Sequence, residues 1–389
     1  MKTAIALVAV LAATPALAQV NQAPPNAPNQ KPAFENQTRA PELSDGVAVR
    51  QQVVIRGLDS PWGLALLPDG AWLITEKPGR MRLFADGALS EPLKGLPKVD
   101  ARGQGGLLDV AVAPDFAQSR RVWFSYAEPR EGGKNGTAVA TGTLSADGTA
   151  LEGVEVIFRQ DPAWASDKHF GSRIVPDGRG GIFVTTGERS VIDARPLAQD
   201  VNTHLGKVLH IDGKTGAPLS GNPFAQGGGK PEIWSWGHRN IQSAALDRQG
   251  RLWTVEHGAK GGDELNRPEA GKNYGWPVIT YGVEYSGKTI GKGLTQAEGM
   301  EQPVYYWDPV IAPSGMAIYD GAMFPEMRGD ILIGGLKSAS VVRLKLQGDR
   351  VAGEQHLAQG IGRVRDVAVA SDGALMVLTD EGALVRLAR

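Results

Sequence analysis

One strand–turn–strand unit recurs six times along the chain, and this repetition constrains the fold more than any other feature. In the first copy, β-favouring runs at 64–67 and 71–75 flank the turn Pro68-Asp69-Gly70. Such runs on either side of a Gly-containing turn are typical of β-hairpins. The copies begin near residues 64, 109, 171, 243, 314 and 367. A chain built from six such hairpins is expected to be all-β.

The spacing of the copies predicts a six-bladed β-propeller with four-stranded antiparallel blades. A blade of this kind needs about 40–50 residues, and loop insertions lengthen it. Further strand candidates lie between the copies, at 80–84, 207–211 and 341–346, and no long segment has an apolar period of a helix. A pair of β-sandwiches is the alternative, but it explains the repetition less well. A strand at 47–55 is expected to complete the last blade beside 383–387 and so close the ring.

The N-terminus has the pattern of a secretory signal peptide. A short basic start precedes an apolar run at 4–13 and an A-x-A site at 16–18, so we expect residues 1–18 to be removed and the protein to be periplasmic. A buried N-terminal helix is the alternative. Residues 19–45 are rich in Pro, Asn and Gln and are expected to form a flexible leader. The propeller domain would then comprise residues 46–389.

Composition and loop lengths narrow the possible functions. The formal net charge of −1 provides no basic field for nucleic acid, and the absence of cysteine excludes disulfides and thiolate metal ligands. No later run approaches the roughly 18 apolar residues of a membrane-spanning helix. The longest insertions follow the third and fourth copies, at 202–231 and 258–303. Long loops inside a compact domain are usually functional, so the site is expected beside the middle blades.

Cationic side chains fall in a loop of each of the last three copies: Arg239, Lys337, Arg363 and Arg365. Equivalent loops of a propeller converge at one end of the central channel. Arg363 and Arg365 are two residues apart, so they share one face of an extended segment. Together with the amide of Asn240, these side chains would form a cationic pocket for a small polyanion. Taken singly, each cation is more often a solvated surface residue, and that alternative stays open here.

Two loops that precede the second and third copies hold groups suited to binding or proton transfer. Gln104 lies in a Gly-rich loop and offers both a donor and an acceptor, although the loop also fits an ordinary turn. His169 precedes the third copy, where a histidine can act as a general base near neutral pH. A structural histidine bonded to the backbone is the more common alternative.

A third candidate is the acidic pair Asp263-Glu264, which is followed by Asn-Tyr-Gly-Trp-Pro at 273–277. Calcium prefers carboxylate and backbone carbonyl oxygens, which a Gly-rich loop with paired acids can supply. The spacing does not match an EF-hand, and a solvated acidic turn explains the pair equally well.

Taken together, these motifs resemble the soluble PQQ-dependent glucose/sorbosone dehydrogenase family, and within it the bacterial aldose sugar dehydrogenases. The resemblance extends from about residue 58 to residue 387. The motifs that carry it are PWGLALLPDG at 61–70, GQGGLLDVAVAPDF at 103–116, HFGSRIVPDG at 169–178, LGKVLHID at 205–212, EIWSWGHRN at 232–240, EHG at 256–258, GGDELN at 261–266, NYGWP at 273–277, IAPSGMAIY at 311–319 and GLK at 335–337. Several independent motifs in one order make the resemblance specific.

The resemblance implies a propeller that oxidises aldoses at C1 to the lactone, with hydride transfer to pyrroloquinoline quinone (PQQ) and with Ca²⁺ holding that cofactor. His169 would be the general base, and Asp263 would lie beside the base and the substrate. The implied cofactor contacts are Gln104, Arg239, Asn240, Lys337, Arg363 and Arg365. The implied metal ligands are the carbonyls of Gly258 and Ala259 for the cofactor's calcium, and Glu264 with the carbonyl of Tyr274 for a second, structural calcium. Gln104 and Trp307 would border the sugar.

One departure from the family pattern limits what can be transferred. Ala259 stands where the best-known glucose enzymes have proline, and the chain is shorter than theirs, so their substrate preference and their dimer are not carried over. We expect a monomer that uses an aldose and passes electrons to an acceptor that the sequence does not identify. A calcium-dependent sugar lactonase and a non-catalytic periplasmic binding propeller are the alternatives. No acidic cluster suited to a lactonase is evident, and intact His169, Arg239, Lys337 and Arg365 argue against a lost cofactor site.

Overall fold

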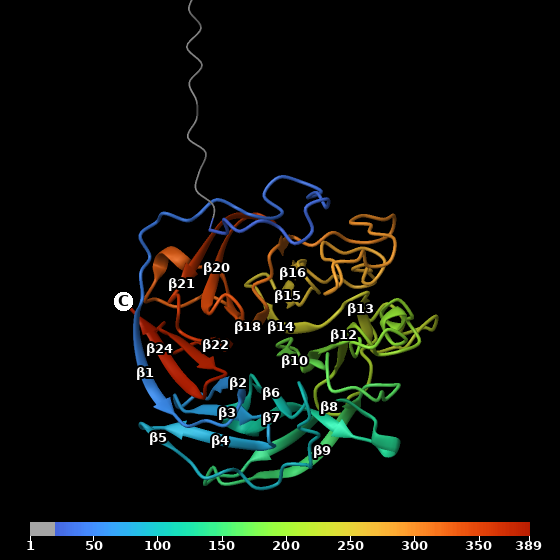
Figure 1. Cartoon of the computed structure of the whole chain (residues 1–389). Helices are drawn as coiled ribbons and strands as arrows, with labels where there is room; N and C mark the ends of the chain where they lie inside the picture. Colours follow the sequence, from blue (N-terminus) through green and yellow to red (C-terminus); the bar gives the residue numbers. More distant parts are fainter. Residues whose placement is uncertain (1–19) are drawn as a thin grey trace, which may run out of the picture.

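Six antiparallel sheets of four strands each surround a central axis in the computed structural model, which describes residues 20–389 (Figure 1). This arrangement confirms the predicted six-bladed β-propeller. The predicted signal peptide, residues 1–18, lies outside the described residues. Within the described part of the chain, no helix has the length and apolarity needed to cross a membrane.

The first strand of every blade lies nearest the axis, and the following strands lie progressively further out. Blade 1 contains β2 (Pro61–Leu66), β3 (Trp72–Glu76), β4 (Arg80–Ala85) and β5 (Ala88–Leu89). Blade 2 contains β6 (Leu107–Val112), β7 (Arg121–Pro129), β8 (Asn135–Leu144) and β9 (Leu151–Arg159). Blade 3 contains β10 (Gly171–Pro176), β11 (Gly181–Thr186), β12 (Lys207–Asp212) and β13 (Ile233–Trp236).

The remaining blades follow the same plan. Blade 4 contains β14 (Ile241–Leu246), β15 (Leu252–Glu256), β16 (Asp263–Asn266) and β17 (Tyr305–Trp307). Blade 5 contains β18 (Pro313–Ile318), β19 (Ile331–Gly335), β20 (Ser340–Gln347) and β21 (Arg350–Leu357). Blade 6 contains β22 (Val364–Val369), β23 (Leu375–Thr379), β24 (Ala383–Ala388) and β1 (Arg50–Arg56). The helical turns are short: α1 (Phe116–Ser119) and 3-10 turns at Glu131–Gly133, Arg195–Ala198 and Pro325–Met327.

The core is divided into layers between neighbouring blades, because each sheet is covered on both faces. Successive side chains of a strand point to opposite faces. In β23, Leu375 and Val377 pack into the layer shared with blade 5, whereas Met376 and Leu378 pack into the layer shared with blade 1. This two-sided burial explains why β23 is apolar from Leu375 to Leu378 instead of alternating.

The ring is closed by pairing the first described strand with the last. β1 pairs with β24 in antiparallel register, from Arg50 opposite Ala388 to Arg56 opposite Ala383. The predicted closure is therefore confirmed. It gives blade 6 its fourth strand and covers the outer edge of β24, which would otherwise have free backbone groups.

The segment before β1 differs from the expected flexible leader. Residues 20–45 follow the outside of blades 4 and 5 and are drawn in dark blue in Figure 1. The side chain of Gln37 is fully buried, and Ala40 is 1% exposed. The prediction was wrong for residues 20–45 because it relied on the missing apolar period, whereas the segment is attached largely by hydrogen bonds to the edges of the blades.

Candidate active site

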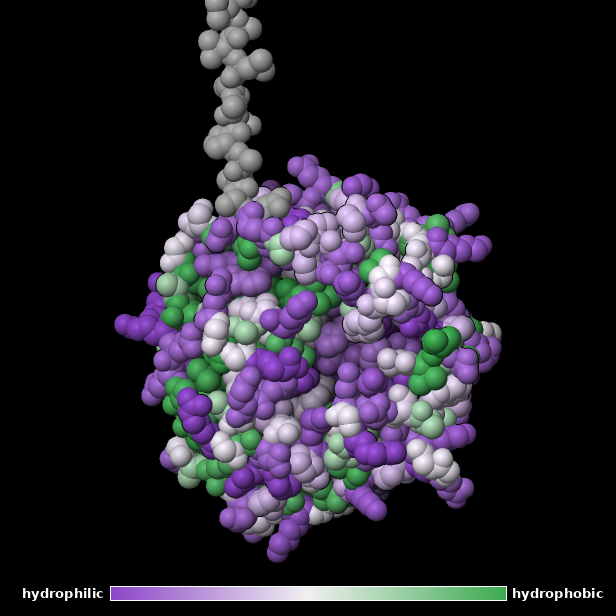
Figure 2. Space-filling view, viewed as in Figure 1, coloured by the Kyte–Doolittle hydropathy of each residue, from purple (hydrophilic) through white to green (hydrophobic). Residues whose placement is uncertain are grey.

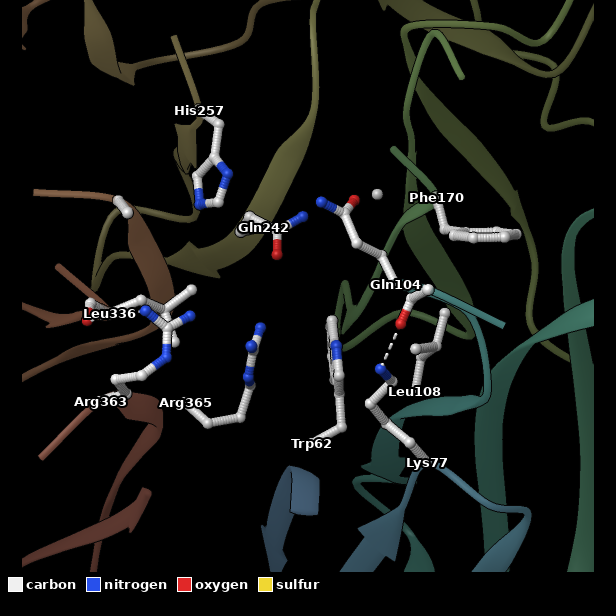
Figure 3. A pocket seen from close by; sticks show the side chains of 13 residues that line it. Trp62, Lys77, Gln104, Leu108, Phe170, Gln242, His257, Leu336, Arg363 and Arg365 are labelled. Atoms are coloured by element: carbon white, nitrogen blue, oxygen red, sulfur yellow. Dashed lines mark hydrogen bonds between the residues drawn. The ribbon is translucent and has the colours of Figure 1, made fainter. Parts of the chain in front are cut away.

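A polar cavity of about 280 Å³ lies at one end of the central channel. Figure 2 shows a hollow near the centre of this face, edged mainly by hydrophilic residues. The side chains drawn in Figure 3 come from several blades and point toward the same space. The lining residues are Trp62, Lys77, Gly103, Gln104, Leu108, Phe170, Gly171, Gln242, His257, Ala312, Leu336, Arg363 and Arg365.

His169 is held immediately beside the lining residues Phe170 and Gln104. Its side chain is buried, and its Nδ1 lies 2.7 Å from Oε1 of Glu188. Its backbone N–H donates to Oε1 of Gln104 at 2.8 Å. Because a carboxylate only accepts hydrogen bonds, Glu188 places the imidazole proton on Nδ1 and leaves Nε2 as the basic nitrogen.

The environment keeps His169 neutral. Burial, and then the positive charge of Arg239, lower the pKa of His169 to about 4, although Glu188 acts in the opposite direction. The neutral base is therefore present at pH 7. The turn is tight: a Cβ added at Gly187 would lie 2.2 Å from the carbonyl oxygen of His169. Only glycine allows β11 to bring Glu188 this close to the base.

Arg239 and Asn240 lie behind the lining, where they hold two of its loops. Nη1 of Arg239 donates to the carbonyls of His257 and Gly258, at 2.9 and 2.5 Å. Oδ1 of Asn240 accepts the N–H of Gly171 at 3.2 Å. Nε of Arg239 and Nδ2 of Asn240 are buried without a hydrogen-bond partner among the described residues. Buried donors without a partner are costly, so these two positions are suited to a ligand.

The cationic side chains of the cavity only partly match the predicted set. Arg363 and Arg365 line the cavity and share one carboxylate, with their Nε atoms 3.0 and 2.8 Å from Asp380. Lys337 is exposed and is not among the lining residues, although the adjacent Leu336 is. Of these three predicted cations, the two arginines therefore lie together at the cavity, whereas Lys337 is not part of its lining.

Lys77 is a further cation of the cavity, which the sequence motifs did not indicate. Its Nζ donates to the carbonyl of Gly103 at 2.6 Å, as Figure 3 shows. Within the described part of the chain, no carboxylate lies within ion-pair distance of this ammonium group. Burial, and then repulsion from Arg365, lower the pKa of Lys77. An anion placed in the cavity would relieve this repulsion.

A buried ion cluster supports the floor of the cavity. The guanidinium of Arg173 lies 4.7 Å from the ring centroid of Trp62, which is a lining residue. Nη1 of Arg173 is 2.6 Å from Asp109 and 3.4 Å from Asp366. These residues come from the innermost strands of three blades, so the cluster fixes the distances between those strands beneath the site.

Asp263 does not face the cavity as the resemblance implied. Its oxygens accept the N–H groups of Gly258 and Ala312, at 2.8 and 2.7 Å, and its side chain is buried. Burial raises the pKa of Asp263 to about 7. Asp263 therefore connects two loops of the site from behind, and no hydrogen bond links it to His169.

Glu264, which was expected to bind a metal, lies beside the buried acid Glu256. Nδ2 of Asn266 donates to Glu256 and to Glu264, at 3.0 Å in both cases, and Oδ1 of Asn266 is buried without a partner among the described residues. Burial, and then the neighbouring charge of Glu256, raise the pKa of Glu264 well above its usual value. The ring of Tyr274 stacks on His238, which bonds to Glu256. No cluster of three His, Asp or Glu side chains suited to a metal occurs in residues 20–389.

Trp307, expected to border the sugar, is instead a core residue. It is 2% exposed, and its indole N–H donates to Glu354 on β21 at 3.3 Å. Its ring packs edge-on against Tyr305 in the layer between blades 4 and 5. The prediction was wrong because the motif located the strand but not the face to which this side chain points.

A single geometric rule accounts for the residues that were missed. In an antiparallel hairpin, the residue before the first strand lies beside the residue after the second strand. The registers show this, with Gly171 opposite Thr186 and Ile241 opposite Glu256. The missed residues of the site follow the second strands of their blades: Lys77, Glu188 and His257. A search of both ends of each predicted hairpin would have found them.

Comparisons with known proteins identify the family of this chain. The family model described as glucose/sorbosone dehydrogenase matches residues 58–386. Aldose sugar dehydrogenase YliI of Escherichia coli K12 is 46% identical over 340 residues, covering 86% of this chain and 90% of that protein. The apo-form crystal structure of the soluble aldose sugar dehydrogenase from E. coli has a TM-score of 0.84 at 44% identity, covering 88% of this chain and 99% of that one.

A further relative was solved with its cofactor. The PQQ-bound form of the aldose sugar dehydrogenase from Streptomyces coelicolor has a TM-score of 0.73 at 30% identity, covering 87% of this chain and 98% of that one. The match to the family model spans most of the chain, and the relatives are covered almost completely. The chain is therefore an oxidoreductase of the glucose/sorbosone dehydrogenase family.

Proposed function

We propose that this protein oxidises aldose sugars at C1 to the lactone, with PQQ as the hydride acceptor and His169 as the general base. The observation that carries the proposal is a neutral, buried His169, oriented by Glu188, beside a cavity lined by Lys77, Arg363 and Arg365. The PQQ-bound relative from Streptomyces coelicolor supports the choice of cofactor.

The residues present fit PQQ, which has three carboxylates. Lys77, Arg363 and Arg365 provide positive charge at the cavity wall, where Asp380 pairs with both arginines. The unpartnered N–H groups of Arg239 and Asn240 supply further donors for oxygen atoms. When bound, PQQ would supply the electrophilic centre that accepts hydride, which no amino-acid side chain provides.

The residues of the chain would carry out the proton transfer. Nε2 of His169 takes the proton of the C1 hydroxyl while the C1–H bond breaks with departure of hydride, and the C1–O bond becomes the carbonyl of the lactone. Glu188 then stabilises the imidazolium through its 2.7 Å contact with Nδ1. Gln104 keeps the base in place through the backbone N–H of His169. The neutral state of His169 at pH 7 makes it ready to accept this proton.

We propose calcium at two positions. The carbonyl of Gly258 already accepts a cationic group, Nη1 of Arg239, so with the carbonyl of Ala259 it suits the cation expected at the cofactor. Glu264, with the carbonyl of Tyr274, would hold the second ion. The raised pKa of Glu264 and the unpartnered oxygen of Asn266 support that choice, because a divalent ion would satisfy both.

The setting proposed for the enzyme is the periplasm, after removal of residues 1–18, where it would act as a monomer and deliver electrons to a separate acceptor. The N-terminal basic start, apolar run and A-x-A site support export.

Reconstitution tests the proposed function. The purified mature chain is depleted of metal, PQQ is added with and without Ca²⁺, and reduction of an artificial dye is followed with a panel of aldoses. We expect dye reduction that requires PQQ, Ca²⁺ and an aldose together. Binding of PQQ without oxidation of any aldose would contradict the substrate class. Absence of PQQ binding would refute the dehydrogenase, and a lactone-hydrolysis assay on the same sample would then test the lactonase.

A further inference from the structure

Residues 20–45, which we call the strap, lie outside the family match at 58–386 and pack against blades 4 and 5. The strap crosses the outer strands of two blades. The N–H of Tyr306 on β17 donates to the carbonyl of Gln37 at 2.8 Å, and the N–H of Leu43 donates to Glu354 on β21 at 2.9 Å. The strap therefore joins blades 4 and 5 from outside the ring.

Asp308 is the main attachment point of the strap. Its Oδ1 accepts both N–H groups of Asn26, from the backbone at 2.8 Å and from the side chain at 3.0 Å. Its Oδ2 accepts the N–H of Ala27 at 2.9 Å, and its backbone carbonyl accepts Nη2 of Arg39 at 2.7 Å. Four donors from the strap thus converge on one buried residue at the end of β17.

A second group of strap contacts holds the segment 281–283. Nε2 of Gln30 donates to the carbonyl of Gly282 at 3.1 Å. The hydroxyl of Tyr281 donates to Oε1 of Gln37 at 3.1 Å, and Nε2 of the same glutamine donates to the carbonyl of Pro303 at 3.0 Å. Gln37 is fully buried, so these bonds are shielded from water.

The loop 258–262 passes between these two attachment points. A Cβ added at Gly261 would lie 2.7 Å from Oδ1 of Asp308, and a Cβ added at Gly262 would lie 2.5 Å from the backbone nitrogen of Gly282. The N–H of Gly262 donates to the carbonyl of Trp307 at 2.9 Å. The loop has glycine at both positions because the backbone is enclosed on both sides at van der Waals distance.

We propose that the strap acts as a clamp that fixes the loop 258–262, and that Asp308 is the positioning residue through which it acts. This inference rests on the proposed function in one respect: the loop carries the carbonyls of Gly258 and Ala259, which are proposed to bind the cofactor's calcium. Loosening the clamp widens the range of positions of these carbonyls. The affinity for Ca²⁺ and PQQ then falls, whereas His169 and Glu188, on blade 3, keep their geometry.

The test is hydrogen exchange on the full mature chain without cofactor, comparing wild type with Asp308→Asn and the milder Asn26→Ala. In Asp308→Asn the side-chain NH₂ group replaces the oxygen that accepts the N–H of Ala27, so two hydrogen-bond donors face each other. Asp372→Asn is the matched control, because Asp372 is an exposed acid that pairs with Arg386 on blade 6. The amides to follow are those of Lys260 and Gly262, bonded to Val283 and Trp307.

We expect exchange at Lys260 and Gly262 to accelerate about tenfold or more in Asp308→Asn, and less in Asn26→Ala, with β23 amides unchanged. The dissociation constant for Ca²⁺ with PQQ should rise at least threefold, while kcat at saturating cofactor stays within twofold. Unchanged exchange in both variants would overturn the clamp, and so would faster exchange across all six blades. If Asp308→Asn fails to fold, the result for Asn26→Ala alone decides whether the clamp is correct. Loop acceleration in a protein whose wild type binds no PQQ would refute only the proposed function.

Discussion

Replacing Glu188 by glutamine is the sharpest test of the proposed base. The substitution keeps the size of the side chain but removes the charge that lies 2.7 Å from Nδ1 of His169. Both side chains are buried, with residue exposures of 1% and 5%, so solvent does not screen the loss. The new amide can donate to Nδ1, which would move the imidazole proton to Nε2 and remove the basic nitrogen from the substrate side.

We expect kcat to fall by roughly 10²–10⁴-fold, the range associated with losing a general base or its correct tautomer, which corresponds to about 3–5 kcal/mol of transition-state stabilisation. The assay is steady-state oxidation of an aldose at saturating PQQ and Ca²⁺, with a parallel PQQ titration by absorbance. The affinity for PQQ should be unchanged.

Glu232→Gln is the control for this experiment, because Glu232 forms a carboxylate–imidazole contact with Nε2 of another buried histidine, His204, at 3.3 Å, and neither residue has a role in the proposed reaction. Its kcat should match that of the wild type. A Glu188→Gln enzyme with wild-type kcat would refute the orientation of the base by Glu188.

Four further outcomes are expected. His169→Ala should retain PQQ binding and lose roughly 10²–10⁴-fold in kcat. In the wild type, kcat/KM should be constant above pH 6 and should fall as the pH decreases through about 4, because His169 then becomes protonated. A midpoint of this pH profile near 7 would contradict the effect of burial on His169. Lys77→Met should weaken PQQ binding, measured by titration, by roughly tenfold, which is the value of one charge-assisted contact. Lys337→Met should weaken it less, because Lys337 lies outside the cavity. A larger effect of Lys337→Met would exclude Lys77 as a contact of PQQ. EDTA should lower the thermal unfolding midpoint of the wild type, and Glu264→Gln should abolish this decrease. An equal decrease in the wild type and in Glu264→Gln would place the second calcium elsewhere.

The fold followed from the sequence because a propeller is a repetition of local units. Each hairpin is specified by its own turn and its own β-favouring runs, and neighbouring layers form when the apolar faces of successive hairpins meet. The continuous apolar run of β23 is explained by burial on both faces. Closure by β1 was predictable because the last blade had an unpaired edge and the strand before the first copy had no partner.

The site was predictable where a loop directly precedes an inner strand, as for Gln104, His169 and Arg363. The residues that follow the second strands, Glu188 and Lys77, could have been placed near the site from the hairpin pattern. Their hydrogen bonds to Nδ1 of His169 and to the carbonyl of Gly103 could not, because these depend on the exact course of the loops. Trp307 was assigned to the wrong environment because the face toward which a side chain points depends on the register of its strand.

What the sequence alone determined was the number of blades, the way the ring closes and the loops that reach the channel, because these depend on local patterns that repeat. Only the tertiary structure decided the protonation of His169, the core position of Trp307 and the attachment of residues 20–45. The pKa of His169 reflects burial and a neighbouring arginine that is distant in sequence. The strap is held by hydrogen bonds to residues about 280 positions away, and such bonds leave no periodic signal in the sequence.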